Sequence, residues 1–455
     1  MELAEVLCIL MFGFLMAAIL IGFPVAFTLA GTALAFAGLG VVLDVFQWRT
    51  MGGLASRIYG MMTNELLIAL PLFVFMGVLL ERSKCAEQLL ETGARLFGKV
   101  SGGLAISVII VGALLAAATG MVAATVATLA LISVPAMRRA GYKPELMVGT
   151  VCASGTLAQL LPPSTNLIVI GDLLRGAVPP GKGMVPVTVT DLFAGAVFPG
   201  VLLVGLYLAY VGMVAWLRPG HCPPVDNGDG RSVTLREVIE VVLAPLLLII
   251  AVLGSILAGI ATPTESSAVG AIGAALIAAH QRSLTWRVLK EVCVATGHLV
   301  TMVFTIMIGA AVFSLVFRGL GGEALAYDIL ASIPGGATGA LTVVLLLVFL
   351  LGFFLDSFEI IFIITPIFAP PLILLGVDPL LFGVLFGVVL QTSYLTPPFG
   401  FAILYFKGAY PDFLAAVAYR GVLPYIGLQL FSLVLIVSLP QIALWLPNVL
   451  IEASR

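Results

Sequence analysis

Two pairs of adjacent prolines interrupt long apolar runs in this chain, and the pairs lie 235 residues apart. The first pair is Pro162-Pro163 and the second is Pro397-Pro398. Because proline lacks an amide hydrogen and disfavours helical backbone in the residue before it, two in succession break a helix. The interior of a membrane tolerates broken backbone only against other protein or beside a water-filled cavity. Paired breaks at matching places in two halves therefore indicate the binding site of a secondary transporter.

The composition is typical of a helical membrane protein. Of the 455 residues, 61% are hydrophobic and 10% are charged, whereas a soluble domain carries about 25% charged residues. We expect an all-α membrane protein with roughly a dozen apolar segments of about 20 residues each. The five cysteines form no CxxC pair, so neither a zinc site nor a disulfide framework is predicted. A basic patch for nucleic acid is absent, and so are zinc-protease, Walker and nucleophile-elbow patterns, which argues against an enzyme or an ATP-driven pump.

Two apolar runs, 103–136 and 341–376, are too long for one helix and too short for two full crossings. The first is interrupted at Thr119-Gly120 and the second at Asp356-Ser357. We expect each run to form a re-entrant helical hairpin, followed by a broken helix over 147–171 in the first half and over 379–406 in the second.

The distribution of basic residues supports both hairpins. If the N-terminus lies outside and each hairpin returns to its own side, 15 of the 21 Lys and Arg residues fall in inner loops. Such an excess on the cytoplasmic side is typical of membrane proteins. The two halves then have inverted topology. A shift of 235 residues also places Pro135 on Pro370 and Gly141 on Gly376, in the same register as the proline pairs.

A broken helix leaves free carbonyls at one half-helix end, which suit a cation, and free amides at the next, which suit a carboxylate. Small polar residues gather at the breaks and hairpin tips: Thr119, Gly120, Thr125, Gly155, Thr156, Gln159 and Ser164 in the first half, and Asp356, Ser357, Glu359, Gln391, Thr392, Ser393, Thr396 and Gly400 in the second. Neutral oxygens with few charges predict a sodium site. The alternative is that such residues simply allow close packing of membrane helices.

Asp356 and Glu359 allow two interpretations. An acid within a membrane run indicates a cation or proton coupling site. The same spacing also fits an N-cap with an acid in the first turn, and the two roles can coexist. The stretch 262–265 is predicted to be an ordinary helix start. His280 and His298 have no partner at ligand spacing, so we expect packing roles for them.

The motifs resemble those of a known family. Residues 153–164 resemble the first broken helix of the large membrane subunit of tripartite ATP-independent periplasmic (TRAP) transporters. Residues 353–366 and 395–400 look like that family's second hairpin and second broken helix, and 259–265 is similar to another of its stretches. The resemblance covers nearly the whole chain. Residues 391–401 are most similar to the branch labelled for mannitol and chloroaromatic compounds.

This resemblance implies an elevator-type transporter with inverted repeats in a bacterial inner membrane, with a periplasmic N-terminus. It implies Na⁺ as coupling ion, an organic-acid substrate, a separate small membrane subunit and a periplasmic substrate-binding protein. Carried over by position, sodium site 1 comprises Thr119, Gly120, Thr125, Gly155 and Thr156, and sodium site 2 comprises Asp356, Ser357, Thr392, Thr396 and Gly400. The substrate residues are Gln159, Pro163, Ser164, Gln391, Ser393 and Pro398, with Glu359 as a possible coupling acid. The tip of the first hairpin is Ser-rich in many members of the family, whereas residues 118–125 of this chain contain no serine.

The expected organisation follows the same resemblance. In chain order it comprises scaffold helices (1–81), an amphipathic interfacial helix (82–101), a first transport core (102–191), further scaffold helices (192–290) with a polar linker (217–238), a second transport core (291–421) and a C-terminal helix (422–455). The alternative reading is a stand-alone Na⁺/carboxylate symporter of the related dicarboxylate superfamily.

Overall fold

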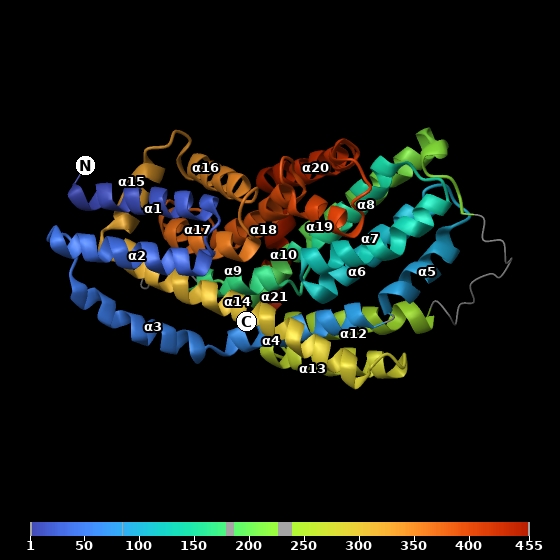
Figure 1. Ribbon diagram of the computed structural model, residues 1–455, viewed down its shortest axis with the longest axis horizontal. Coiled ribbons are helices and arrows are strands. Elements are labelled where there is room, and N and C mark those ends of the chain that lie inside the picture. The colour runs from blue at the N-terminus through green and yellow to red at the C-terminus, as the bar shows by residue number, and fades with distance from the viewer. Residues whose placement is uncertain (1, 84, 179–185, 226–238, 454–455) are drawn as a thin grey trace.

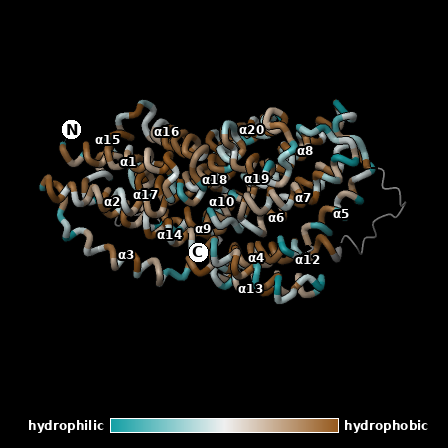
Figure 2. The backbone as a smooth tube through the Cα atoms, viewed as in Figure 1, coloured by the Kyte–Doolittle hydropathy of each residue, from teal (hydrophilic) through white to brown (hydrophobic). Residues whose placement is uncertain are grey.

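A computed structural model describes residues 2–83, 85–178, 186–225 and 239–453, and every regular element in these ranges is a helix (Figure 1). Seven of the described helices are long and apolar enough to cross a membrane, or up to nine if each of two bent helix pairs counts as one span. Apolar residues also predominate along outer helices such as α1 and α2 (Figure 2). Phe27 is 71% exposed and Trp216 is 83% exposed, which suits a surface that faces lipid. The prediction of an all-α membrane protein is confirmed.

One group of helices forms what we call the outer body. Its members are α1 (Leu3–Ile21), α2 (Val25–Val42), α3 (Gly53–Met62), α4 (Glu65–Arg82), α12 (Ala244–Leu257), α13 (Pro263–His280) and α14 (Trp286–Gly319). Within it α4 packs along α13, and α2 packs along α14. Helix α13 begins at an N-cap Thr262 whose side chain and that of Glu265 cap each other's backbone, so the predicted helix start is confirmed.

The first hairpin and first broken helix lie where the sequence predicts them. The hairpin is α6 (Gly103–Thr119) and α7 (Val122–Arg139), and the broken helix is α8 (Pro144–Thr156), a 3-10 turn (Leu157–Gln159) and α9 (Thr165–Ala177). Gly120 has φ +62°, a left-handed conformation that glycine adopts readily. This turn lets α7 reverse direction directly after α6 ends.

The second half repeats this order. Helix α15 (Gly322–Ala331) leads into a hairpin of α16 (Gly336–Leu351) and α17 (Ser357–Leu374), and the broken helix is α18 (Pro379–Leu395) and α19 (Phe401–Ala409). The backbone between α18 and α19 turns through Gly400, at φ +43°. In both breaks the peptide bond between the two prolines is cis.

The two repeats interlock. The second half of the first broken helix, α9, packs on α17 of the second hairpin. The second half of the second broken helix, α19, packs on α7 of the first hairpin. Each hairpin therefore covers the far end of the other repeat's broken helix, which brings both breaks into one core.

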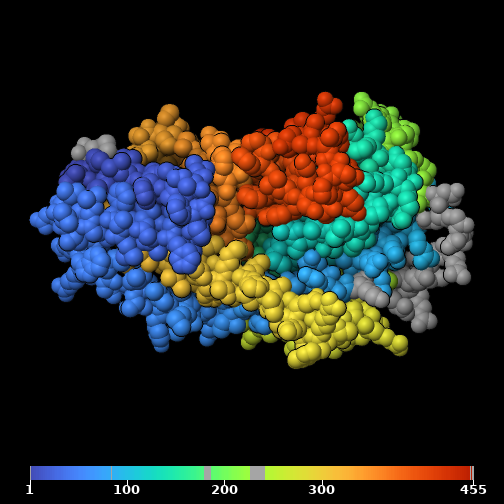
Figure 3. Space-filling model, viewed as in Figure 1, coloured from blue at the N-terminus to red at the C-terminus, as the bar shows by residue number. Residues whose placement is uncertain are grey.

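Three further helices complete this core: α10 (Val189–Leu217), α20 (Ala415–Ser438) and α21 (Gln441–Ala453). Helix α20 packs along α8, as the space-filling view also shows (Figure 3), and α10 packs on α20, α21 and α18. In this grouping by packing, α10 lies in the range predicted to be scaffold (192–290) and α14 lies mostly in the range predicted to be the second transport core (291–421), and which segments move stays a prediction. The expected single C-terminal helix over 422–455 is also two helices, because Pro440 cannot supply the amide that would continue α20.

An amphipathic helix, α5 (Cys85–Phe97), lies within the predicted range 82–101, and its place at the membrane interface stays a prediction. Its buried side, which includes Leu89 and Leu90, packs on α6, and Glu87 and Glu91 are exposed. The polar linker predicted at 217–238 starts directly after α10, and its residues 226–238 lie outside the described ranges.

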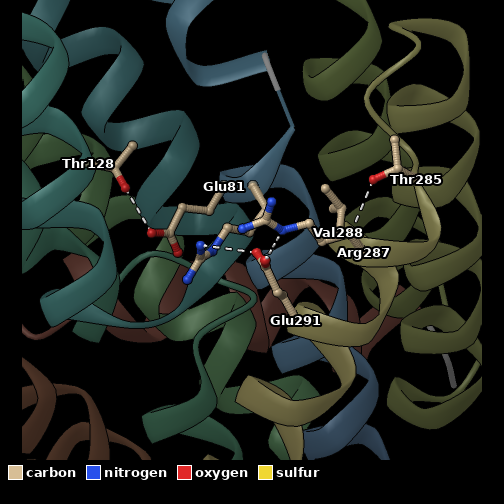
Figure 4. A network of polar contacts seen from close by, with 7 residues as sticks. Glu81, Thr128, Thr285, Arg287, Val288 and Glu291 are labelled. Carbon is tan, nitrogen blue, oxygen red and sulfur yellow. Dashed lines mark hydrogen bonds and ion pairs between the residues drawn. The ribbon is translucent and has the colours of Figure 1, made fainter.

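Few polar contacts join the outer body to the two repeats, and one of them is the ion pair between Arg318 on α14 and Glu323 on α15, at 2.6 Å. At one end of α4, the Asn64 amide donates to the Asp172 carboxylate on α9 at 2.7 Å. At the other end, the Thr128 hydroxyl on α7 donates to the Glu81 carboxylate at 2.8 Å (Figure 4). The neighbouring ion pair, Arg82 with Glu291 at 3.6 Å, lies within the outer body.

Candidate functional site

The first hairpin tip is closed by threonine hydroxyls. The Oγ1 atoms of Thr119 and Thr125 lie 2.8 Å apart, and Thr125 also bonds to the Met121 carbonyl at 2.7 Å. The Thr165 hydroxyl, on the first turn of α9, donates to the Gly120 carbonyl at 3.0 Å. The tip of the first hairpin therefore contacts the first break directly.

Gly155 and Thr156 end the first half of the broken helix. A Cβ on Gly155 would lie 2.3 Å from Val126 Cγ2 and 3.1 Å from Val126 N, so only glycine lets α8 approach α7 this closely. The Thr156 hydroxyl donates to the Ala153 carbonyl at 2.9 Å. Since its proton is used there, its oxygen lone pairs are available to accept a donor or a cation.

The second hairpin tip is a capped helix start. Asp356 is the N-cap of α17, and its carboxylate accepts a hydrogen bond from Phe358 N at 3.3 Å. The Glu359 side chain reciprocally accepts from Asp356 N at 2.9 Å. The capping interpretation is thus confirmed, and a role of either acid in coupling stays a prediction.

Tyr394 joins this tip to the second broken helix. Its hydroxyl donates to Asp356 Oδ1 at 2.7 Å and accepts from Ser357 N at 2.6 Å. Gly352, before the tip, lies so close to α18 that a Cβ there would be 2.0 Å from Ser393 Oγ. The second tip therefore packs against the second break, as the first tip does against the first.

The second break presents threonine hydroxyls in the same manner as the first. The Thr392 hydroxyl donates to the Val388 carbonyl at 2.8 Å, and the Thr396 hydroxyl donates to the Thr392 carbonyl at 2.7 Å. Their oxygens keep free lone pairs. The loop that follows is more accessible than its counterpart, because Pro398 is exposed whereas Pro163 is buried.

One contact links the two repeats at the tips. The Ser357 hydroxyl, on the second tip, donates to Asn166 Oδ1 at 3.4 Å. Asn166 lies in the first turn of α9, next to the Thr165 that holds the first tip. The structure thus brings both tips and the start of α9 into one buried polar region.

All of the expected substrate residues except Pro398 are buried. Gln159 is 1% exposed, and its Nε2 and Oε1 have no hydrogen-bond partner among the described residues. Ser164 donates to the Gln159 carbonyl at 3.1 Å, and Ser393 donates to the Leu390 carbonyl at 2.8 Å. Gln391 is fully buried and is held by Tyr207 on α10, where Nε2 donates to the tyrosine hydroxyl at 3.2 Å.

Four contact residues lie outside the predicted set: Asn166, Tyr207, Tyr394 and Gln429. Tyr394 and Asn166 are close in sequence to the proline pairs, so a wider window around each break would have included them. Tyr207 and Gln429 lie within the uninterrupted helices α10 and α20, and no local signal marks them.

The chemistry of the region suits a hard monovalent cation. It offers threonine oxygens, backbone carbonyls at helix ends and one carboxylate, and most of these groups are buried. Among the described residues, no group of three or more His, Cys, Asp or Glu side chains could hold a metal ion. These donors therefore fit Na⁺ better than a transition metal, which prefers nitrogen and sulfur ligands.

A cavity of about 180 Å³ lies on the boundary between the outer body and the core. Its lining includes Arg57 on α3 and Arg318 on α14, facing Asp172 on α9 and Phe362 on α17. The two bodies are therefore incompletely packed against each other at this end.

The sequence matches one family model over nearly its whole length. The model is described as "Tripartite ATP-independent periplasmic transporter, DctM component", and it matches residues 12–442. The first-tip and second-tip residues and both proline pairs lie inside the matched range.

Several relatives are large permease proteins of TRAP transporters. The chain is 28% identical over 411 residues to the C4-dicarboxylate TRAP transporter large permease protein DctM of Pseudomonas aeruginosa, covering 89% of this chain and 91% of that protein. It is 27% identical to the ectoine TRAP transporter large permease protein TeaC of Halomonas elongata, covering 84% and 86%. The crystal structure of the Alcanivorax borkumensis YdaH transporter has a similar fold, with a TM-score of 0.63 at 17% identity, covering 86% of this chain and 87% of that one.

Proposed function

This chain belongs to the DctM-component family of tripartite ATP-independent periplasmic transporters, and from that premise we propose that it is the large membrane subunit of a sodium-coupled importer of small organic acids. It is a multi-pass membrane protein and a transport subunit rather than an enzyme. The observation that carries the proposal is the meeting of two hairpin tips with two broken helices in one buried polar region.

Sodium coupling is supported by the acceptor capacity of the threonine hydroxyls. Thr125, Thr156, Thr392 and Thr396 each donate to a carbonyl of their own helical segment, which leaves oxygen lone pairs that can accept a donor or a cation. We assign the first pair, with Thr119, Gly120 and Gly155, to one ion. We assign the second pair, with Asp356, Ser357 and Gly400, to another.

An acidic substrate is supported by one helix start beside these positions. Helix α9 begins at Thr165 without a side-chain cap, so its free amides and positive partial charge lie at the first break. Gln159, with both amide atoms unpaired among the described residues, adds a donor and an acceptor close to α9. Relatives named for C4-dicarboxylate and for ectoine are consistent with a small organic-acid substrate. The likeness to the mannitol or chloroaromatic branch stays a prediction.

An elevator mechanism is supported by the division into an outer body and a core. Only two hydrogen bonds between side chains, Asn64 with Asp172 and Glu81 with Thr128, cross between α4 and the core among the described residues. The incompletely packed boundary near Arg57 and Arg318 supports the same view. We propose that the core, with α10, α20 and α21, moves against the outer body.

The remaining parts of the system follow from the family. We propose a separate small membrane subunit, a periplasmic binding protein that delivers the substrate, a location in the bacterial inner membrane and a periplasmic N-terminus. The outer body presents wide apolar surfaces, including exposed Phe27 and Ile272, that suit lipid or the small subunit.

Uptake by proteoliposomes tests the proposal. Vesicles with this chain and its small subunit should accumulate a labelled organic acid, such as a C4-dicarboxylate, only with an inward Na⁺ gradient and the cognate binding protein. Choline in place of Na⁺ is the control. If this chain alone moves free substrate at the full rate, the stand-alone symporter of the dicarboxylate superfamily is the correct reading.

A further inference from the structure

A fully buried hydrogen-bond cluster lies inside the core, centred on the hydroxyl of Tyr207. This oxygen accepts hydrogen bonds from Gln391 Nε2 at 3.2 Å and from Gln429 Nε2 at 2.8 Å. All three side chains are 0% exposed. They come from α10, α18 and α20, so the cluster holds three core helices together at one point.

The cluster also reaches the first broken helix. Gln429 Nε2 lies 3.4 Å from Thr156 Oγ1, so one amide group is shared between Tyr207 and Thr156. On the other side, Gln391 directly precedes Thr392 on α18. An unbroken chain of hydrogen bonds therefore runs from a threonine at the end of α8 to the turn of α18 that carries the second break.

Close helix packing places Gln429 there. Glycines face each other where α8 crosses α20: a Cβ on Gly149 would lie 2.1 Å from the Gly421 carbonyl oxygen. Thr156 lies two helical turns after Gly149 on α8, and Gln429 lies about two turns after Gly421 on α20. The glycine crossing thus fixes the distance over which the amide reaches the threonine.

Packing alone does not account for these polar groups. The Oε1 atoms of Gln391 and Gln429 are buried and have no partner among the described residues. An orphaned buried acceptor is destabilising, and apolar residues of the same shape would avoid that cost. A neighbouring tyrosine shows the simpler arrangement: the Tyr425 ring lies 5.2 Å from that of Tyr207, and its buried hydroxyl pairs with Thr150 at 2.7 Å.

We propose that Tyr207 is a positioning residue that couples the two proposed sodium sites through Gln429 and Gln391. The proposal rests on the proposed function, since it takes Thr156 and Thr392 as ion ligands. An ion that draws on the lone pairs of Thr156 Oγ1 displaces the weak 3.4 Å donor bond from Gln429. That amide then bonds to Tyr207 alone, which fixes the hydroxyl that orients Gln391 and the adjacent Thr392. Filling one site thereby prepares the other, and Na⁺ binding becomes cooperative.

The test is the Na⁺ dependence of thermal unfolding of the purified chain, with choline chloride keeping the ionic strength constant, so no substrate is needed. Wild type should gain stability with Na⁺ along a sigmoidal curve with a Hill coefficient above 1. Tyr207→Phe should bring the Hill coefficient to about 1 and raise the half-saturating Na⁺ concentration about fivefold, the effect of losing one ordinary hydrogen bond.

Tyr425→Phe is the matched control, because it also removes a buried tyrosine hydroxyl from the same cluster of rings. It should lower the melting temperature without changing the Hill coefficient or half-saturation. Gln429→Met, which breaks the link to Thr156 at similar volume, should act like Tyr207→Phe and serves if that variant does not fold. A sigmoidal wild-type response that both variants retain overturns the coupling role. A wild type that responds equally to Na⁺ and choline refutes sodium coupling itself, and the inference with it.

Discussion

Tyr394 holds the second hairpin tip against the second break, and Tyr394→Phe removes that contact without changing the ring. The ring is 1% exposed and lies 5.1 Å from that of Phe401, so phenylalanine keeps the packing. What disappears is the hydroxyl, which donates to Asp356 at 2.7 Å and accepts from Ser357 N at 2.6 Å.

The size of the effect follows from these two bonds. A hydrogen bond to a charged group contributes about 1.5–3 kcal/mol, and a buried donor left without a partner costs about 1–3 kcal/mol. Ser357 N is at the start of α17, where no carbonyl within the helix can replace the lost acceptor. We therefore expect Tyr394→Phe to destabilise the protein by about 2–4 kcal/mol, because water that enters the gap restores part of the loss.

Thermal unfolding in detergent measures this, with Tyr405→Phe as the control. Tyr405 is half-buried on α19, and its hydroxyl has no hydrogen bond among the described residues. Tyr394→Phe should melt several degrees below wild type, whereas Tyr405→Phe should melt at the same temperature as wild type. Equal melting of both variants would refute the reasoning that the tyrosine hydroxyl secures the tip.

Three further predictions concern packing, orientation and the ion sites. Gly149→Ala should destabilise the protein by about 1–3 kcal/mol in the same unfolding assay, because its Cβ would lie 2.1 Å from the Gly421 carbonyl oxygen. Cys293 is the one exposed cysteine of the five, and a membrane-impermeant maleimide should label it in inverted membrane vesicles but not in right-side-out vesicles. Thr396→Ala and Thr156→Ala should each raise the half-saturating Na⁺ concentration for uptake about tenfold, the effect of losing about 1.4 kcal/mol of ion binding.

Each of these has its own control. Gly205→Ala adds the same methyl group where nothing lies within 4 Å, and it should leave stability unchanged. Cys293→Ser should abolish labelling, and labelling only from the periplasmic side would contradict the orientation. Thr342→Ala removes an exposed hydroxyl that also bonds back to its own helix, so an equal change in Na⁺ dependence there would argue against ion coordination by the break residues.

The breaks and tips could be predicted from sequence because they depend on local backbone chemistry. Proline removes an amide wherever it stands, so Pro162-Pro163 and Pro397-Pro398 interrupt the helices in the structure as expected. Helix α6 ends at Thr119, and Gly120 supplies the left-handed turn. The Asp356 cap is equally local, since its partners are within three residues.

The partners across the core could not be predicted in this way. A helix that is apolar all round carries no pattern that tells which side faces protein and which faces lipid. Helix α10 is about as apolar as α2 of the outer body, and only the structure shows that α10 packs on α18 and α20. Tyr207 and Gln429 acquire their roles from that packing, so their sequence neighbours give no sign of it.

Gly77 of α4 brings the outer body against the backbone of the first hairpin tip. A Cβ there would lie 2.5 Å from Thr119 Cα and 2.9 Å from the Ala118 carbonyl oxygen, so bare backbone meets the first hairpin tip. The contact is made by a residue without a side chain, so a larger residue at position 77 would meet the backbone of the tip. Under the proposed elevator mechanism, we expect a shift of the tip on ion binding to alter this backbone contact directly. Occupancy of the first proposed ion site should then change how readily the core moves against the outer body.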